Sequence, residues 1–292
     1  MLNERYRILR RLHESVMSTV YVAQDMRNGR YVVVKSPRAI GTFHDPAWET
    51  LDIPELAERT KTSALNEYIL REALVLSGLS HPHIVRLQDA GTDGWGNRYV
   101  VLEFLEGLPL HLLRRRKINR LKARTVINLG RQLLEGLEAV HAAGFVHRDI
   151  KPANLIMTSD SLKIVDFALA CSIHVDDPRA AEGYMVGTPL YASPEQCNGQ
   201  KRVDGRADLY AVGHVLYRLL SETWAYGREK SSIRSIIDRQ KYAEPIPFDI
   251  AAPGMRVSES LESVIFRALE KRPEDRFQSA GEMREALLSA QA

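Results

Sequence analysis

The chain has 292 residues, of which 45% are hydrophobic and 26% are charged. This balance excludes a disordered or fibrous protein, and the length allows either one large domain or two closely joined lobes. The net charge of +3, from 40 basic and 37 acidic residues, is too small to indicate a nucleic-acid partner or a membrane surface.

Cysteine usage and hydropathy favour a cytoplasmic protein. Cys171 and Cys197 allow at most one disulfide and no metal-ligand cluster, so we expect reduced thiols. No apolar run approaches the roughly 20 residues that span a bilayer. The start MLNERYRILRRL also lacks the apolar core of a signal peptide. We therefore expect no membrane segment.

The first third of the chain is typical of a small sheet. TVYVAQD and YVVVKS are rich in branched and aromatic residues, with the hairpin signal Asn28-Gly29 between them. Apolar residues at helical spacing follow from about 63 to 79. Two more strand-like runs, IVRLQDAG and RYVVLEFLEG, complete the predicted antiparallel sheet with one main helix.

The remaining segments predict an insert and a helical region. Residues from about 37 to 62 mix Pro, Gly and acidic residues without a sustained period, which indicates an irregular insert with room for one short helix. Past Gly107, helical patterns dominate, the clearest from 126 to 141. The sequence thus predicts an α+β fold with a sheet lobe and a larger helical lobe, and the crevice between such lobes is the expected ligand site.

The strongest chemical signal is HRDIKPAN at residues 147–154, followed by LIMTSDSLKIVDF. The runs LIM and LKIV predict a hairpin that brings Asn154 and Asp166 to the same end. An amide oxygen and a carboxylate are ligands that Mg²⁺ prefers. Asp149, on the adjoining loop, is then placed to accept a proton from an attacking hydroxyl.

These residues resemble the catalytic loop and metal-binding segment of protein kinases, and the D-x-K-P-x-N form resembles the Ser/Thr branch. The likeness runs nearly from end to end, with HPHIVRL and SPEQ most similar to bacterial members. It implies an enzyme that uses ATP and Mg²⁺ to phosphorylate Ser/Thr hydroxyls of protein substrates. It also implies one kinase domain over 1–292, with an N-lobe at about 1–102, a hinge at about 103–107 and a C-lobe at about 108–292.

The resemblance carries roles onto matching residues. For catalysis and metal binding they are Asp149 as the base, Lys151 beside the transferring phosphate, Lys35 on the nucleotide phosphates with its ion-pair partner Glu72, and Asn154 and Asp166 as metal ligands. For the nucleotide ring they are Leu102 as gatekeeper, the backbones of Glu103 and Leu105, and the side chains of Leu12, Val20, Val33 and Leu155.

Further roles concern the activation segment and its supports. Thr188 is expected to bridge Asp149 and Lys151, and Asp208 to brace the catalytic loop. The remaining residues of this group are Arg148, Phe167 of the metal-binding triplet, and the expected pair of Glu195 with Arg276.

The chain departs from the family pattern at its phosphate loop. The family's G-x-G-x-x-G-x-V is replaced by HESVMSTV, residues 13–20, without any of the three glycines. Because glycine permits close backbone approach, we expect weaker phosphate cradling. Ala168 also replaces the glycine of the metal-binding triplet, at a cost of roughly 1 kcal/mol if that position needs φ > 0.

Two features suggest regulation. The chain has Ala180 and Glu182 where bacterial relatives commonly carry switching threonines. We hypothesise that Glu182 pairs with Arg148 and holds the activation segment without phosphorylation. The long interval between Lys35 and Glu72 fits a regulatory or partner-binding insert.

Two other functions compete with an active protein kinase. A pseudokinase, which binds nucleotide or protein but transfers phosphate poorly, is favoured by the missing glycines and by Ala168. A kinase acting on a small molecule is disfavoured by Lys151 and by the segment from Thr188 to Glu195, which argue for a protein substrate.

Overall fold

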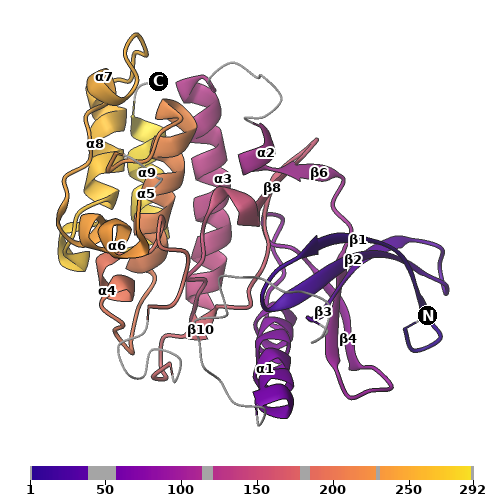
Figure 1. Cartoon of the computed structure of the whole chain (residues 1–292). Helices are drawn as coiled ribbons and strands as arrows, with labels where there is room; N and C mark the ends of the chain where they lie inside the picture. The colour runs from indigo at the N-terminus through magenta and orange to yellow at the C-terminus, as the bar shows by residue number, and fades with distance from the viewer. Residues whose placement is uncertain (1, 39–56, 114–120, 178–184, 228–230, 291–292) are drawn as a thin grey trace. The chain divides into compact units, whose positions relative to one another are not determined.

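The chain divides into two compact units. Unit 1 comprises Met1–Gly78 and Val85–Leu105, and unit 2 comprises Leu79–Ile84 and Glu106–Ala292. The computed structural model describes residues 2–38, 57–113, 121–177, 185–227 and 231–290 (Figure 1).

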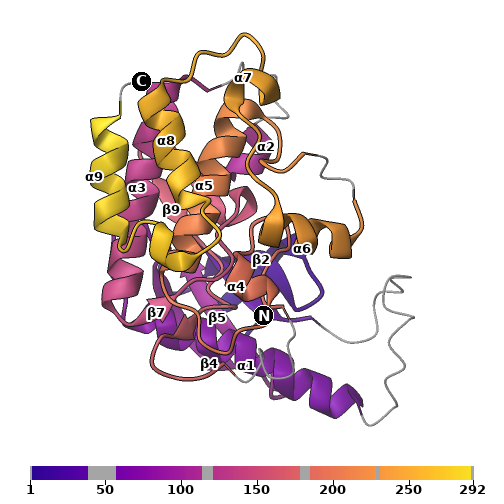
Figure 2. The same ribbon diagram turned by 90° about the vertical axis from the view of Figure 1, so that its left-hand side faces the viewer.

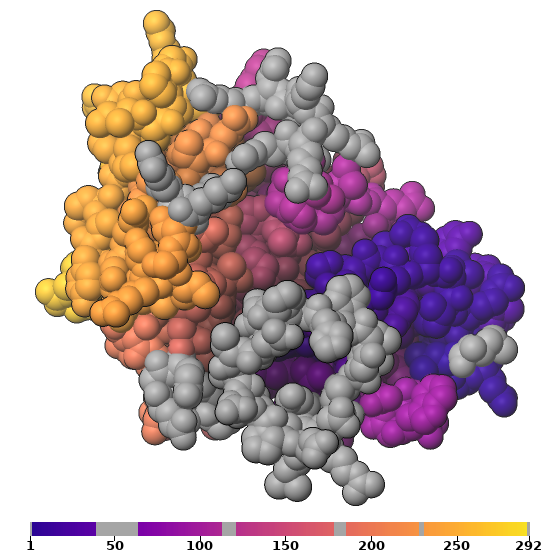
Figure 3. Space-filling view, viewed as in Figure 1, coloured from indigo at the N-terminus to yellow at the C-terminus, as the bar shows by residue number. Residues whose placement is uncertain are grey.

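The strands of unit 1 form an antiparallel sheet in the order β1-β2-β3-β5-β4. Their bounds are Tyr6–Glu14 for β1, Ser18–Asp25 for β2, Tyr31–Pro37 for β3, Leu87–Thr92 for β4 and Arg98–Glu103 for β5. The predicted turn at Asn28-Gly29 is present, with Gly29 at φ 74°. Nearly all of β1 is exposed, and its indigo side chains lie at the surface in Figure 3.

The core of unit 1 lies under the central strands. Tyr6, Val32, Val34, Tyr99 and Val101 are buried there together with Ala23. Helix α1, Ala57–Ser77, packs against β3, β4 and β5. It begins before the predicted position of about 63, so the expected insert at about 37–62 includes its first turns. The rest of that insert, residues 39–56, lies outside the described residues.

Unit 2 is mainly helical, as the sequence predicts. Its helices are α2 (Leu110–Leu113), α3 (Ala123–Ala142), α4 (Pro194–Cys197), α5 (Arg206–Ser221), α6 (Ile233–Tyr242), α7 (Phe248–Ala251), α8 (Glu259–Ala268) and α9 (Ala280–Ser289), with short 3₁₀ turns at Pro152–Asn154 and Pro273–Asp275. Its strands are β6 (Gly107–Pro109), β7 (Phe145–Val146), β8 (Leu155–Thr158), β9 (Leu162–Ile164) and β10 (Cys171–Ser172).

Helix α3 is the central support of unit 2. Its apolar residues recur at helical spacing, and Val126, Leu129, Leu133, Leu137 and Val140 are all buried. These side chains pack the helix against α5, α9 and β9, and Figures 1 and 2 show α3 between its helical neighbours. Burial of a Val or Leu side chain stabilises the fold by about 1.5–3 kcal/mol, so this stripe anchors the loop that follows α3.

Two small strand pairs position that loop. β7 pairs with β10, and β8 pairs with β9 in the predicted hairpin, where Leu155 lies opposite Ile164. The hairpin turn is closed by the Thr158 N–H, which donates to the Ser161 carbonyl at 3.0 Å. The catalytic-loop motif therefore lies between β7 and β8, and Asp166 follows β9.

A helix that spans a bilayer needs both sufficient length and a continuous apolar surface. Among the residues that the structure describes, no helix combines the two.

Candidate functional site

Unit 1 holds a buried ion pair between a strand and a helix. Lys35 Nζ, on β3, lies 2.6 Å from Glu72 Oε2, on α1. The Lys35 side chain is 6% exposed and the Glu72 side chain is fully buried, so the two charges are shielded from water. The predicted ion pair is present. Because a buried charge is stable only with a partner, Glu72 fixes where the Lys35 ammonium lies.

The residues expected at the nucleotide ring are distributed over both units. Val33 on β3 lies opposite Leu102 on β5, and Val20 on β2 lies opposite Lys35. Glu103 ends β5, Leu105 follows it half-buried, and Leu12 on β1 is 43% exposed. Leu155 is fully buried in unit 2. Contact of these residues with a nucleotide stays a prediction.

In unit 2, a buried carboxylate fixes the backbone of the catalytic loop. Asp208, on α5, accepts hydrogen bonds from the His147 N–H at 2.9 Å and the Arg148 N–H at 2.8 Å. Its Oδ2 also lies 2.9 Å from His141 Nε2. Burial acts to raise the pKa of Asp208, but the hydrogen bond from His141 and nearby charges outweigh it, so the pKa is lowered and the group stays a carboxylate.

The carboxylate of Asp149 is held on both sides. Thr188 Oγ1 donates to Oδ1 at 2.6 Å, and Lys151 Nζ donates to Oδ2 at 2.7 Å and to Thr188 Oγ1 at 2.8 Å. Asn154 Nδ2 donates to Oδ2 at 3.0 Å and to the Asp149 carbonyl at 2.9 Å. The predicted Thr188 bridge is present. Four residues from two separate segments thus converge in one network of unit 2.

His147 connects the loop to the strand that carries Asp166. Its Nδ1 accepts from the Asp149 N–H at 3.2 Å, and its Nε2 lies 3.2 Å from the Val165 carbonyl. A carbonyl only accepts, so the proton of a neutral ring lies on Nε2. The His147 ring also meets the edge of the buried Phe167 ring, with ring centres 4.7 Å apart. These contacts lock the loop to the start of the metal-binding triplet.

Asn154 and Asp166 have the composition of a magnesium site. The Val165 N–H donates to the Asn154 carbonyl at 3.0 Å, so Asp166, the next residue, follows a backbone contact with Asn154. Since Asp149 binds the Asn154 amide nitrogen, the amide oxygen is the atom left to meet a cation. No cluster of three or more His, Cys, Asp or Glu side chains suited to a metal occurs in the described ranges. An amide with a carboxylate fits Mg²⁺, which keeps several water or phosphate ligands of its own.

The condition for strain at Ala168, a positive φ, is not met. The left-handed residue of the triplet is Asp166, at φ 66°, whereas Ala168 is outside the positive-φ region. The missing glycine therefore carries no backbone penalty here. Arg148, at φ 65°, is the second strained position of this region.

Two further contacts place the end of the activation segment. Glu195 and Arg276 form the predicted pair, a buried fork with Oε1–Nη1 at 2.7 Å and Oε2–Nη2 at 2.8 Å. Gly187, at φ 125°, lies so close to the catalytic loop that a Cβ there would be 2.9 Å from the Arg148 carbonyl. Ser193, where the family usually has Ala, caps α4 by accepting from the Gln196 N–H.

A model of the protein kinase domain family matches residues 48–288. This chain belongs to the protein kinase family. The matched residues include the whole catalytic loop and the activation segment. Lys35 and the β1–β2 turn, where the family glycines are missing, lie before the match. The ion pair of Lys35 with Glu72, a residue inside the match, supports the correspondence of Lys35.

Relatives and a solved structure agree with this assignment. The chain is 34% identical over 99% of its length to serine/threonine-protein kinase pkn2 of Myxococcus xanthus, and 30% identical over 98% of its length to PknB of Mycobacterium tuberculosis. It covers 33% and 43% of those proteins. The kinase domain of Mycobacterium tuberculosis PknI, solved as a cysteine-to-alanine mutant, matches with a TM-score of 0.65 and 25% identity, over 97% of this chain and 94% of that one.

The structure reveals a partner of Arg148 that sequence reasoning missed. Arg148 Nη1 pairs with Asp177 Oδ2, and both side chains are almost completely buried. Asp177 is itself fixed, because its N–H donates to the Lys201 carbonyl at 3.1 Å. The hypothesised partner Glu182 lies outside the described residues. The sequence feature that could have indicated this partner is the acidic doublet Asp176-Asp177, soon after the metal-binding triplet.

A serine closes the β1–β2 turn. Ser15 Oγ accepts from the Met17 N–H at 3.2 Å and from the Ser18 N–H at 3.0 Å. In a glycine-rich loop such amides are the groups that approach phosphate. Glu14, beside the turn, is neutralised by Arg11 and by Arg38, whose Nε lies 3.3 Å away. The Met17 and Ser18 N–H groups of the turn therefore already have an acceptor within the turn. This is consistent with the expectation of weaker phosphate cradling.

Replacing Ser15 by glycine tests this interpretation. Ser15→Gly frees two amides and permits closer approach, so we expect its dissociation constant for MgATP, measured by calorimetry, to fall about tenfold, or ~1.4 kcal/mol. Ser15→Ala removes the hydroxyl without adding glycine flexibility and separates the two effects. An unchanged constant for Ser15→Gly would contradict the role given to the turn.

The importance of the Arg148–Asp177 pair can be tested by comparing a substitution of Asp177 with one of Asp176. Asp177→Ala leaves Arg148, the residue before Asp149, buried without that carboxylate, so we expect the rate of phosphoryl transfer to a peptide to fall by at least about tenfold. Asp176→Ala is the matched control, because Asp176 is exposed and pairs with the exposed Arg202. Equal losses in the two variants, or no loss in Asp177→Ala, would refute the proposed importance of the Arg148 pair.

Proposed function

We propose that this chain is an active protein kinase domain that transfers the γ-phosphoryl group of ATP to Ser/Thr hydroxyls of protein substrates, with Mg²⁺. The observation that carries this proposal is the carboxylate of Asp149, held by Lys151, Thr188 and Asn154 in one network. The relatives named above are Ser/Thr protein kinases, and they support the substrate class. The proposed domain covers 1–292, a part of the length of those relatives.

The geometry of Asp149 suits a base that orients a hydroxyl. Each carboxylate oxygen has two lone pairs. Oδ2 already accepts from Lys151 and Asn154, whereas Oδ1 accepts from Thr188 and retains a lone pair for a further donor. A substrate hydroxyl donates to this carboxylate as its oxygen attacks the γ-phosphorus. The bond from that phosphorus to the bridging oxygen breaks, ADP leaves, and the hydroxyl proton passes to Asp149.

Charge neutralisation is assigned to the cationic side chains. Lys151, 2.7 Å from Asp149, faces the same position as the attacking group and stabilises negative charge that develops there. Lys35, oriented by Glu72 at 2.6 Å, would contact the nucleotide phosphates. Asn154 and Asp166 would hold Mg²⁺, which when bound offsets the charge of the phosphates.

The competing proposal is a pseudokinase, and the observation that favours it is the closed Ser15 turn. A low nucleotide affinity would reduce turnover even though the proposed catalytic side chains are present. Against a scaffold without transfer, the contacts of Asp149, Lys35 and Asp208 are all in place, and Ala168 is unstrained. We therefore place the active kinase first, with weakened ATP binding.

The setting proposed for this activity is the cytoplasm. Cys171 and Cys197, the only cysteines of the chain, are both buried and form no disulfide. Burial raises the pKa of Cys197 to about 12, so its thiol stays protonated and unreactive. Reduced thiols are typical of a reducing compartment. We also propose that the insert within residues 37–62 binds a regulatory partner, a proposal motivated by its length alone.

A phosphate-transfer assay tests the function directly. Purified protein is incubated with labelled ATP, magnesium and a generic Ser/Thr protein substrate, and we expect label in the substrate. Asp149→Asn removes the base while keeping the size of the side chain, so the rate should fall by at least about 10²-fold. Asp160→Asn, at the exposed β8–β9 turn, is the matched control and should transfer normally.

The outcomes separate the candidates. Label absent from both the wild-type and Asp149→Asn reactions would favour the pseudokinase. Equal label in both would show that another residue takes the proton, and the assignment of Asp149 would be wrong.

A further inference from the structure

The segment Thr188–Tyr191 of unit 2 is tied to the catalytic carboxylate at one end and to a buried polar network along its length. Thr188 Oγ1 donates to Asp149 and accepts from Lys151. The Tyr191 and Ala192 N–H groups donate back to the Thr188 carbonyl at 2.9 and 3.0 Å, which closes a turn. A shift of this turn would therefore move a group bound directly to Asp149.

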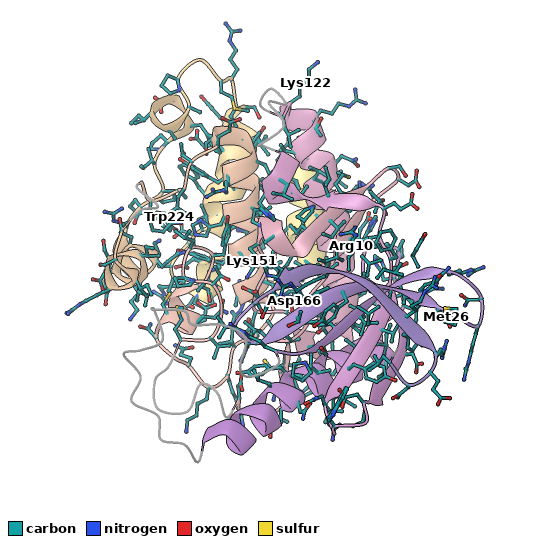
Figure 4. All side chains as sticks on the ribbon, turned by 45° about the vertical axis from the view of Figure 1, so that its right-hand side comes forward. Arg10, Met26, Lys122, Lys151, Asp166 and Trp224 are labelled. Atoms are coloured by element: carbon teal, nitrogen blue, oxygen red, sulfur yellow. The ribbon has the colours of Figure 1, made fainter. Side chains whose placement is uncertain are left out.

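Trp224, which lies in the segment after α5, forms a hydrogen bond to the turn. Its indole Nε1–H donates to the Leu190 carbonyl at 3.0 Å, and the residue is only 2% exposed (Figure 4). The indole meets the Tyr226 ring edge-on, with ring centres 5.4 Å apart. Because the ring is fixed by packing, its single N–H is aimed at one carbonyl.

Gln240, on α6, holds the adjacent carbonyl. Its Nε2 donates to the Pro189 carbonyl at 2.9 Å, and the residue is fully buried. Its Oε1 accepts from Tyr210 Oη at 2.7 Å and lies 3.0 Å from His214 Nε2. An amide oxygen only accepts, so these contacts fix the amide orientation and direct its N–H toward Pro189.

His214 and Lys271 support Gln240 from α5 and from the segment after α8. His214 is buried on α5, and burial lowers its pKa to about 3, so the neutral ring donates from Nε2. Lys271 Nζ lies 3.8 Å from the centre of the Tyr226 ring and donates to the Gln240 carbonyl at 3.2 Å. The network thus joins α5, α6 and the segment after α8 beneath one surface turn.

The turn itself is accessible beside the catalytic residue. Pro189, Leu190 and Tyr191 are half-buried, so their side chains are partly open to a ligand while their backbone is fixed from below. We propose that Trp224 and Gln240 are positioning residues for the peptide substrate, because they fix the two carbonyls of the turn that follows Thr188. The inference rests on the proposed kinase function and adds two residues outside the family motifs described above.

Removal of each donor tests this role. Trp224→Phe keeps an aromatic ring but loses the N–H, and Gln240→Met keeps the length of the side chain but cannot donate. For both variants we expect the KM for a substrate peptide to rise about tenfold, which corresponds to a loss of ~1.4 kcal/mol of peptide binding free energy. The KM for ATP should stay within about twofold of the wild-type value. Trp95→Phe is the matched control, since Trp95 is 88% exposed, and should match the wild type.

Hydrogen exchange gives a second readout that needs no activity. We expect the Tyr191 and Ala192 amides to exchange faster in Trp224→Phe and Gln240→Met, with unchanged exchange in the catalytic loop at 147–154. Unchanged exchange in the turn, or equal rises of the KM for peptide and the KM for ATP, would overturn the inference. A wild-type protein that transfers no phosphate would instead overturn the proposed function, and the exchange result would still show whether the two residues hold the turn.

Discussion

The arrangement of the catalytic residues depends on one buried carboxylate, Asp208. It accepts from two consecutive backbone N–H groups, those of His147 and Arg148, and thereby holds Arg148 in the left-handed region at φ 65°. Without such a partner, each of these two buried N–H groups would be left without an acceptor, which destabilises the fold by about 1–3 kcal/mol. The strained backbone would then relax. Because Asp149 is the next residue, the direction of its carboxylate is set by α5, which packs on α3 within the core of unit 2.

From this constraint the other contacts follow in order. The fixed loop presents Asp149 to Lys151 and Thr188, so the activation segment is bound to the catalytic loop through the side chain proposed as the base. Arg148 binds Asp177, and its carbonyl accepts from Gln196 Nε2 at 2.9 Å, which adds two more connections between the same segments. Electrostatic preorganisation of this kind lowers the cost of charge development during transfer.

The contacts between residues of recognisable family motifs could be predicted from the sequence, whereas those made by residues outside the motifs could not. Lys35 with Glu72, Thr188 with Asp149, and Glu195 with Arg276 are present because the family pattern fixes residue type and order. Asp177 depends on where the chain after β10 folds back, and Gln240 depends on the packing of α6, which no local pattern encodes. At Ala168 the expected need for glycine was conditional, and the left-handed conformation lies at Asp166 instead.

We propose that Asn154 and Asp166 hold the magnesium that accompanies ATP. Calorimetric titration with ATP, in the presence and absence of Mg²⁺, tests this proposal. We expect Mg²⁺ to tighten ATP binding to the wild-type protein and to the surface control Asp160→Asn, and we expect this gain to be lost in Asn154→Ala and Asp166→Asn. A gain from Mg²⁺ that is undiminished in Asp166→Asn would show that Asp166 does not hold the ion.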